Sequence, residues 1–221
     1  MGTITRTFAN NITTSGVFKP TAFNNASFDN VTAVPSGAVE GGNMVLLSTQ
    51  TASASASISF TTGIDSTYKE YMFILNNMHP QTNSVTFDFQ CSTDGGSNYN
   101  TTITSSSFRA YHSEADTGAV LAYHTSSDLA QSTSYQQLFA EALKNDNDSS
   151  GSGTLHLFNP SSTTYVKHFI FNGNFTYPSV DISINQYIAG YFNTTSAINA
   201  IDFKMSSGNI DDGTIQMFGI L

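Results

Sequence analysis

An alternating segment that ends in a two-glycine turn constrains the fold of this chain more than any other feature. Residues 85–91 read Val-Thr-Phe-Asp-Phe-Gln-Cys, with an apolar side chain at every second position, as in a β-strand with one buried face. Residues 92–99, Ser-Thr-Asp-Gly-Gly-Ser-Asn-Tyr, follow at once. Glycine adopts the positive φ angles of tight turns, and the carboxylate of Asp94 can hydrogen-bond within its own turn. The sequence therefore predicts a tight β-hairpin here.

Strand-length segments separated by Gly, Asn, Asp and Pro continue from residue 43 to the end of the chain. In residues 51–60 the alternation is strict, and Ala52, Ala54, Ala56, Ile58 and Phe60 are expected on one face. The remaining segments with strand character are 44–48, 69–78, 107–114, 119–124, 135–143, 154–158, 164–175, 182–192, 197–205 and 210–221, of which 107–114 and 119–124 are expected to form a hairpin. Short strands without a helical period predict an all-β fold, an antiparallel β-sandwich of jelly-roll-like type, over residues 43–221.

Charge and composition exclude several classes of partner. Charged residues make up 10% of the chain, and seven Lys and Arg against sixteen Asp and Glu leave a net charge of −9. The basic residues are scattered singly, whereas nucleic-acid binding needs a clustered positive surface. No segment approaches the ~20 apolar residues of a membrane span. We therefore expect no nucleic-acid partner and no membrane insertion. The first residues lack an apolar leader, which predicts synthesis in a cytoplasm without export.

Residues 1–42 differ from the rest, because they are polar and Asn-rich with isolated apolar residues that fit neither helix nor strand. A free segment of this kind would not fold alone. The sequence predicts an extended arm that docks on another protein chain, and the alternative is an arm that folds back on its own domain. The side chains expected to dock are Phe8, Ile12, Val17, Phe18, Phe23 and Phe28.

Motifs for catalysis and metal binding are weak. There is no G-x-S-x-G sequence, and Cys91 lies within a strand, where it is expected to be a small buried side chain. None of the five histidines has an H-x-H, H-E-x-x-H or H-x-x-x-H partner on its own segment. The carboxylate pairs at 114/116, 146/148 and 211/212 fall in expected turns, and only the 146–150 segment has the alternating oxygens of a calcium loop. The sequence predicts neither an enzyme nor a bound cofactor or metal.

Exposed tyrosines beside amides and hydroxyls can stack on sugars and bond to them. The tyrosines that alternation places near the surface are Tyr99, Tyr111, Tyr123, Tyr177 and Tyr191. These five residues are the candidates for contact with a glycan.

Two resemblances bear on function. The pattern S-x-D-x-G-x-x-aromatic at 92–99 resembles the Asp-box of sialidase-like propellers, where the box braces a hairpin without taking part in catalysis. A propeller repeats that box once per blade, and here it occurs once, so a structural turn is the preferred interpretation. The segment from Phe60 to Leu221 resembles small β-sandwich virion structural proteins of tailed bacteriophages, especially marine ones. This second resemblance rests on residues 60–68 (FTTGIDSTY), 92–97 (STDGGS), 108–112 (FRAYH), 155–164 (LHLFNPSSTT), 189–195 (AGYFNTT) and 203–210 (FKMSSGNI).

That class implies a homotrimeric, non-enzymatic appendage that is made in the host cytoplasm and ends up in the virion. The first hypothesis is a short tail fibre or knob, docked on other virion proteins of the capsid or tail by its N-terminal arm and touching host surface glycans for host attachment. The alternative is a capsid decoration protein whose arm clamps the shell. The chain has no heptad shaft, which a long fibre needs and a decoration protein does not. A distant alternative is a carbohydrate-binding module or a carbohydrate-active enzyme.

Overall fold

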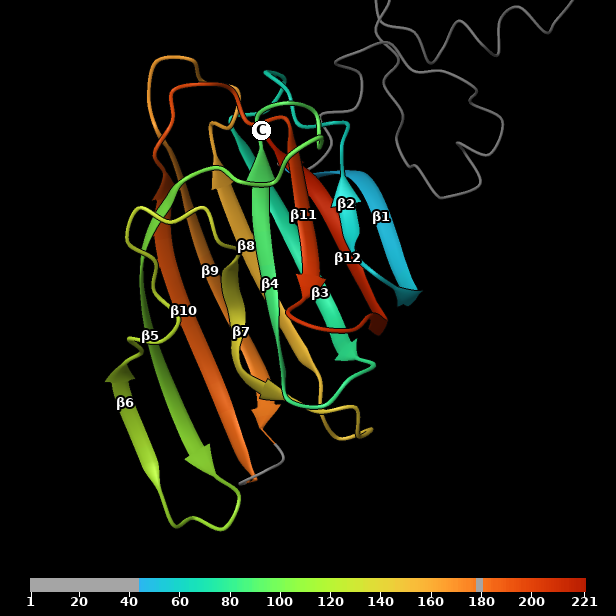
Figure 1. Cartoon of the computed structure of the whole chain (residues 1–221), viewed down its shortest axis with the longest axis vertical. Coiled ribbons are helices and arrows are strands. Elements are labelled where there is room, and N and C mark those ends of the chain that lie inside the picture. Colours follow the sequence, from blue (N-terminus) through green and yellow to red (C-terminus); the bar gives the residue numbers. More distant parts are fainter. Residues whose placement is uncertain (1–43, 178–180) are drawn as a thin grey trace, which may run out of the picture. The chain divides into compact units, whose positions relative to one another are not determined.

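Twelve strands and no helix make up the part of the chain that the structure, a computed structural model, describes: residues 44–177 and 181–221 (Figure 1). The predicted all-β sandwich is confirmed, while the expected arm, residues 1–42, lies outside the described residues. In chain order the strands are β1 (Met44–Ser55), β2 (Ile58–Phe60), β3 (Glu70–Pro80), β4 (Val85–Ser92), β5 (Ile103–Ser113), β6 (Ala119–Tyr123), β7 (Gln136–Leu143), β8 (Gly151–Phe158), β9 (Lys167–Tyr177), β10 (Ile182–Phe192), β11 (Ala200–Met205) and β12 (Ile210–Ile220).

The strands form two antiparallel sheets of unequal width. The large sheet has the order β1-β12-β3-β8-β9-β10-β5-β6, and the small sheet has the order β2-β11-β4-β7. Without β5, β6, β9 and β10, two four-stranded sheets remain, β1-β12-β3-β8 and β2-β11-β4-β7, an order that is compatible with a jelly roll. The pairs β5–β6 and β9–β10 are additions that widen the large sheet. In Figure 1, β5 and β6 lie to one side of the small sheet, beyond the strands that it covers.

Phenylalanine fills the space between the sheets. The ring of Phe203 on β11 is the hub, because its centroid lies 5.7 to 6.4 Å from four other rings, Phe60, Phe73, Phe87 and Phe89. Full burial of each such side chain stabilises the fold by about 1.5–3 kcal/mol. Cys91, also on β4, is fully buried, as the sequence predicted. The alternation of β4 and β11 therefore builds one aromatic core from both sheets.

The predicted single strand over residues 51–60 is wrong. β1 runs through Ser55, Ala54 adopts a φ of +49°, and the chain then crosses to the small sheet at Ile58. Ala52 is buried under the large sheet, whereas Ala54 and Ala56 are exposed. Two strands in different sheets thus share one alternating sequence pattern, because the corner between them takes up an even number of residues.

The turn at 92–99 is ordered as predicted, but it does not close a hairpin. β4 pairs with β11 and β7, while β5 pairs with β10 and β6, so the turn joins the two sheets. Gly95 and Gly96 have φ values of +74° and +89°. The Asp94 carboxylate accepts hydrogen bonds from the Asn98 amide and backbone and from Ser92, and these bonds lower its pKa to about 2. The predicted hairpin at 107–124 is confirmed as β5–β6.

β8 begins three residues earlier than the sequence suggests, because Gly151 already belongs to the strand. The sequence suggests a turn through residue 153, yet Gly151 already pairs with Phe175 of β9. A Cβ atom on Gly151 would lie 2.5 Å from the ring of Phe139. Glycine is needed there because a buried ring occupies the space that any other side chain would take.

Candidate functional site

The side of the large sheet that faces away from the small sheet carries two rows of paired residues, which we call the outer face. Strand alternation points these side chains away from the core, because their neighbours along each strand are buried in it. The first row crosses seven strands through Leu46, Phe218, Met72, His156, Ile170, Ala189 and Ser106. The second crosses all eight through Thr49, Gln216, Ile74, Thr154, Asn172, Tyr187, Phe108 and Tyr123.

The two rows of the outer face contain no charged residue, and the first row is largely apolar. Leu46 is 52% exposed and Ile170 50%, both large values for aliphatic side chains. Neither row contains Lys, Arg, Asp or Glu. Two carboxylates beside the rows are bonded to them: Oε1 of Glu70, in the adjoining row, lies 2.5 Å from Nδ1 of His156, and Asp128 accepts a hydrogen bond from the Tyr123 hydroxyl over 2.7 Å. The rows themselves thus carry no charged residue, and each of these two acidic groups already has a partner in them.

The structure does not bring the five candidate tyrosines together. Tyr123 lies on the outer face, and Tyr191 points to the same side of β10, with its ring 6.0 Å from that of His168. Tyr111 and Tyr177 pack partly buried against the core. The hydroxyl of Tyr99 is buried and has no hydrogen-bond partner among the described residues. Glycan contact by these residues stays a prediction, and it would need more than one surface.

Sequence reasoning missed two aromatic residues of the outer face. Phe108 on β5 and Tyr187 on β10 stack with ring centroids 4.8 Å apart, and Asn185 donates from Nδ2 to the Tyr187 hydroxyl over 2.6 Å. The alternation of polar and apolar residues on β5 is visible in the sequence, but its two faces are reversed. The polar residues Ser107 and Arg109 point inward, and Phe108 points outward. This inversion follows from the width of the large sheet, because beyond the small sheet the inner side of β5 meets polar groups.

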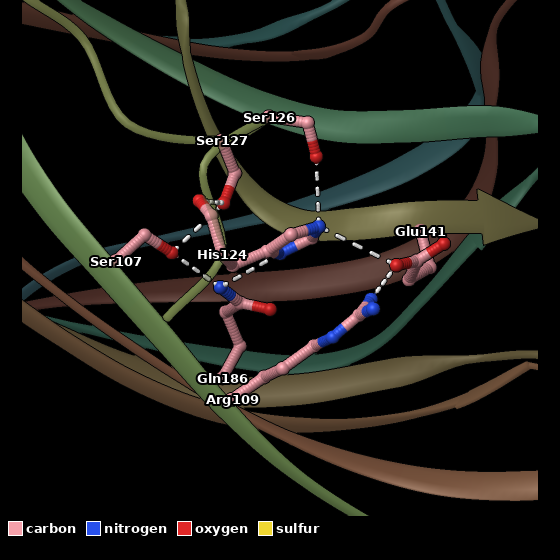
Figure 2. Close-up of polar contacts among 7 residues, drawn as sticks. All are labelled: Ser107, Arg109, His124, Ser126, Ser127, Glu141 and Gln186. Carbon is pink, nitrogen blue, oxygen red and sulfur yellow. Dashed lines mark hydrogen bonds and ion pairs between the residues drawn. The ribbon is translucent and has the colours of Figure 1, made fainter. Parts of the chain in front are cut away.

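Those polar groups form the network drawn in Figure 2. Arg109 of β5 makes an ion pair with Glu141 of β7, and His124, which follows β6, approaches the same carboxylate with Nε2 at 3.4 Å from Oε1. Burial, followed by the charge of Arg109, lowers the pKa of His124 below its ordinary value of 6.5. The charged end of the network therefore ties the large sheet to the small one.

Hydroxyls and an amide complete the network. Gln186 of β10 donates from Nε2 to the Ser107 hydroxyl over 2.5 Å, and the Ser127 hydroxyl donates to the same oxygen over 2.8 Å. The Gln186 Oε1 atom is buried without a hydrogen-bond partner within the described ranges. Both Ser107 and Gln186 are fully buried, so these bonds replace the hydration that the groups lose on folding.

The network contains a serine, a histidine and an acid, but not in the arrangement of a hydrolytic triad. Ser126 Oγ lies 2.8 Å from Nε2 of His124, and the Glu141 carboxylate approaches that same nitrogen. In a triad the acid holds Nδ1 while the serine uses Nε2. Here Nδ1 faces the Gln186 amide at 3.5 Å. This geometry suits a structural bridge between sheets.

A second polar cluster covers the outer side of the small sheet. Asp202 accepts hydrogen bonds from the hydroxyls of Ser59, over 2.5 Å, and Tyr135, over 2.9 Å. Burial, and then the Asp202 charge, raise the pKa of Tyr135. Burial raises the pKa of Asp88 to about 6, although the nearby charge of Lys204 works against this shift. No sequence motif predicts this cluster, because its members come from four separate segments.

The described part of the chain contains neither a cluster of metal ligands nor a membrane-spanning helix. No three His, Cys, Asp or Glu side chains there converge as metal ligands, and Asp146 of the suggested calcium loop instead meets His79 Nε2 with its backbone carbonyl at 3.1 Å. No helix long and apolar enough to cross a membrane occurs in residues 44–177 or 181–221.

The docking residues Phe8, Ile12, Val17, Phe18, Phe23 and Phe28 lie outside the described residues. Comparison with known proteins adds no identity: no protein-family model, curated protein or solved structure matches this chain. Argument about function therefore rests on the surfaces described above.

Proposed function

We propose that this chain is a non-enzymatic structural protein of a bacteriophage particle, a short fibre or knob-like appendage that associates with copies of itself. The observation that carries the proposal is the outer face. Monomeric proteins rarely expose contiguous apolar patches larger than a few hundred Å². Two rows without a charged residue, one across seven strands of the large sheet and one across all eight, favour a surface that is covered in the assembled protein.

A second copy of this chain is the occupant that the charges favour. Each chain carries a net charge of −9, and like charges in contact oppose association. The rows of two copies can meet with few carboxylates between them, because neither row carries one and the adjacent Glu70 and Asp128 are bonded to His156 and Tyr123. The resemblance to phage appendages suggests that three copies assemble.

Docking on the particle is the proposed role of residues 1–42. Deleting them should leave the strand domain able to associate with its own copies but absent from purified particles. Normal incorporation of the shortened chain would refute the docking role. Residues Phe18 and Phe23 are the first point substitutions to make, both to Ser, since these two carry most of the apolar surface in the middle of the segment.

Gold-labelled antibody against the chain, viewed by electron microscopy on purified particles, tests the function as a whole. Label on the tail supports the fibre or knob and host attachment. Label spread over the head supports the second candidate, a capsid decoration protein, which the absence of a heptad shaft favours. Particles without label contradict both. A carbohydrate-active enzyme, the distant alternative, would require polysaccharide turnover by the isolated chain.

A further inference from the structure

A pocket of about 330 Å³ lies between two loops that are far apart in the sequence. One loop precedes β3 and contributes Ser66 and Lys69, and the other joins β8 to β9 and contributes Asn159 and residues 161–165. Each loop overlaps one of the segments on which the resemblance to phage proteins rests, residues 60–68 and 155–164. Of these segments the outer face includes only His156, which does not line the pocket.

Backbone hydrogen bonds hold the second loop in place. Asn159 donates its N–H to the carbonyl of Lys69 over 2.5 Å, which joins the two loops directly. The carbonyl of Pro160 accepts from the N–H of Ile198 over 2.9 Å. The hydroxyl oxygen of Ser162 accepts from the N–H groups of Thr164, over 3.2 Å, and Tyr165, over 3.1 Å. These bonds form the pocket before any ligand arrives, so binding need not order the loop.

The lining combines hydroxyls, one amide, one ammonium and one exposed ring. Residues 161–164 are all Ser or Thr, Asn159 supplies the amide, and Tyr165 is 71% exposed. Lys69 makes no ion pair with any described residue. No Asp or Glu lines the pocket, although the chain has more than twice as many acidic as basic residues.

Three of the other four cations among the described residues are engaged, and the fourth, Lys144, does not line the pocket. Arg109 pairs with Glu141, and the ammonium of Lys167 donates to the carbonyls of Thr194 and Ser196. The ammonium of Lys204 lies 3.9 Å from the centre of the Tyr135 ring. Lys69 differs from these three because it lines an open, hydroxyl-rich pocket and makes no ion pair with a described residue.

We propose that this pocket binds a sugar residue that carries an anionic group, a carboxylate or a sulfate, within a polysaccharide. The ring of Tyr165 stacks on the sugar face, Asn159 and the hydroxyls of 161–164 bond to the sugar hydroxyls, and Lys69 pairs with the anion. One such pocket binds weakly, and several copies in one appendage raise the avidity. The role of this pocket in host contact rests on the proposed function, an appendage of a bacteriophage particle.

Affinity electrophoresis of the full chain tests the proposal with three polysaccharides: a polyuronate (alginate), a sulfated galactan (λ-carrageenan) and neutral dextran. We expect retardation by alginate or carrageenan, and which of them acts identifies the anionic group. Tyr165→Ala should weaken that binding about tenfold, the equivalent of a contact of about 1.4 kcal/mol. Lys69→Gln should abolish the preference over dextran. The matched control is Leu121→Ala, which truncates a side chain that is 74% exposed on β6 and belongs to neither row of the outer face.

If none of the three polysaccharides retards the chain, or if Tyr165→Ala and Leu121→Ala weaken binding equally, the proposed pocket is refuted. Equal retardation by dextran, unchanged in Lys69→Gln, would overturn the anionic class. These outcomes are independent of particle labelling. Labelled particles without polysaccharide binding refute the pocket alone, and polysaccharide binding without labelled particles refutes the virion role alone.

Discussion

Arg109 of β5 and Glu141 of β7 form an ion pair that joins the large sheet to the small one. Each side chain is about one-quarter exposed, at 25% and 23%. The pair lies where the large sheet extends past the aromatic core, and His124 closes it from the side of β6. Polar contacts there take the place that phenylalanine has between the central strands.

Glu141→Gln should lower the free energy of unfolding by about 1–3 kcal/mol, because it leaves the half-buried Arg109 guanidinium without its counter-charge. Urea unfolding at pH 7.5 measures the change. The control is Glu114→Gln on the exposed turn after β5, which should stay within about 0.5 kcal/mol of the parent. An equal effect of the two substitutions would show that the ion pair contributes nothing to stability.

His124 should make stability fall as the pH falls below 6.5. Its folded pKa lies below the ordinary 6.5, so in that range the unfolded chain binds more protons than the folded one, and acid favours unfolding. The titration of the His124 ring, followed by NMR, should have a midpoint below 6.5. His124→Gln should remove this part of the pH dependence. A midpoint above 6.5 would mean that the charge of Glu141 raises the pKa of His124 by more than burial and the charge of Arg109 lower it.

Asp88 should act in the opposite direction. Its folded pKa of about 6 lies above the ordinary 3.8, so its buried charge costs stability above pH 6, and that cost disappears as the pH falls toward 4. Asp88→Asn should therefore raise the free energy of unfolding at pH 7.5 by up to about 3 kcal/mol, with little difference at pH 4. Urea unfolding at both pH values measures this. A less stable variant at pH 7.5 would show that the carboxylate is needed as a partner of Lys204.

Gly151→Ala should destabilise the sandwich by about 1–3 kcal/mol, because the new methyl group would meet the Phe139 ring, which is fully buried and cannot move away. Thermal unfolding provides the measurement. Gly118→Ala is the matched control, since a Cβ atom at Gly118 meets nothing within 4 Å. The double change Gly151→Ala with Phe139→Leu should recover part of the loss. If the double variant is no more stable than Gly151→Ala alone, the loss does not come from contact with the Phe139 ring but from strain in the backbone.

Local features of the fold could be predicted from sequence, and pairings between distant strands could not. Alternation identified β4 and the β5–β6 hairpin, because each depends on a few neighbouring residues. The break at Ala54 was missed, since both strands around the corner continue one alternating pattern. Phe108 and the pocket at Lys69 and Tyr165 were also missed. Both depend on which distant segments meet: β5 lies beyond the small sheet, and the loop at 159–165 contacts the one before β3.

Sedimentation velocity of the full chain over a range of concentrations tests the central claim, that copies associate through the outer face. We predict an oligomer that Ile170→Lys converts to monomers with unchanged thermal unfolding of the monomer, because Ile170 is half-exposed at the centre of the first row. Tyr165→Lys, the same kind of change at a side chain that is 71% exposed on the loop between β8 and β9, should leave the oligomer intact. A monomer at every concentration, or an oligomer that survives Ile170→Lys, would contradict the account.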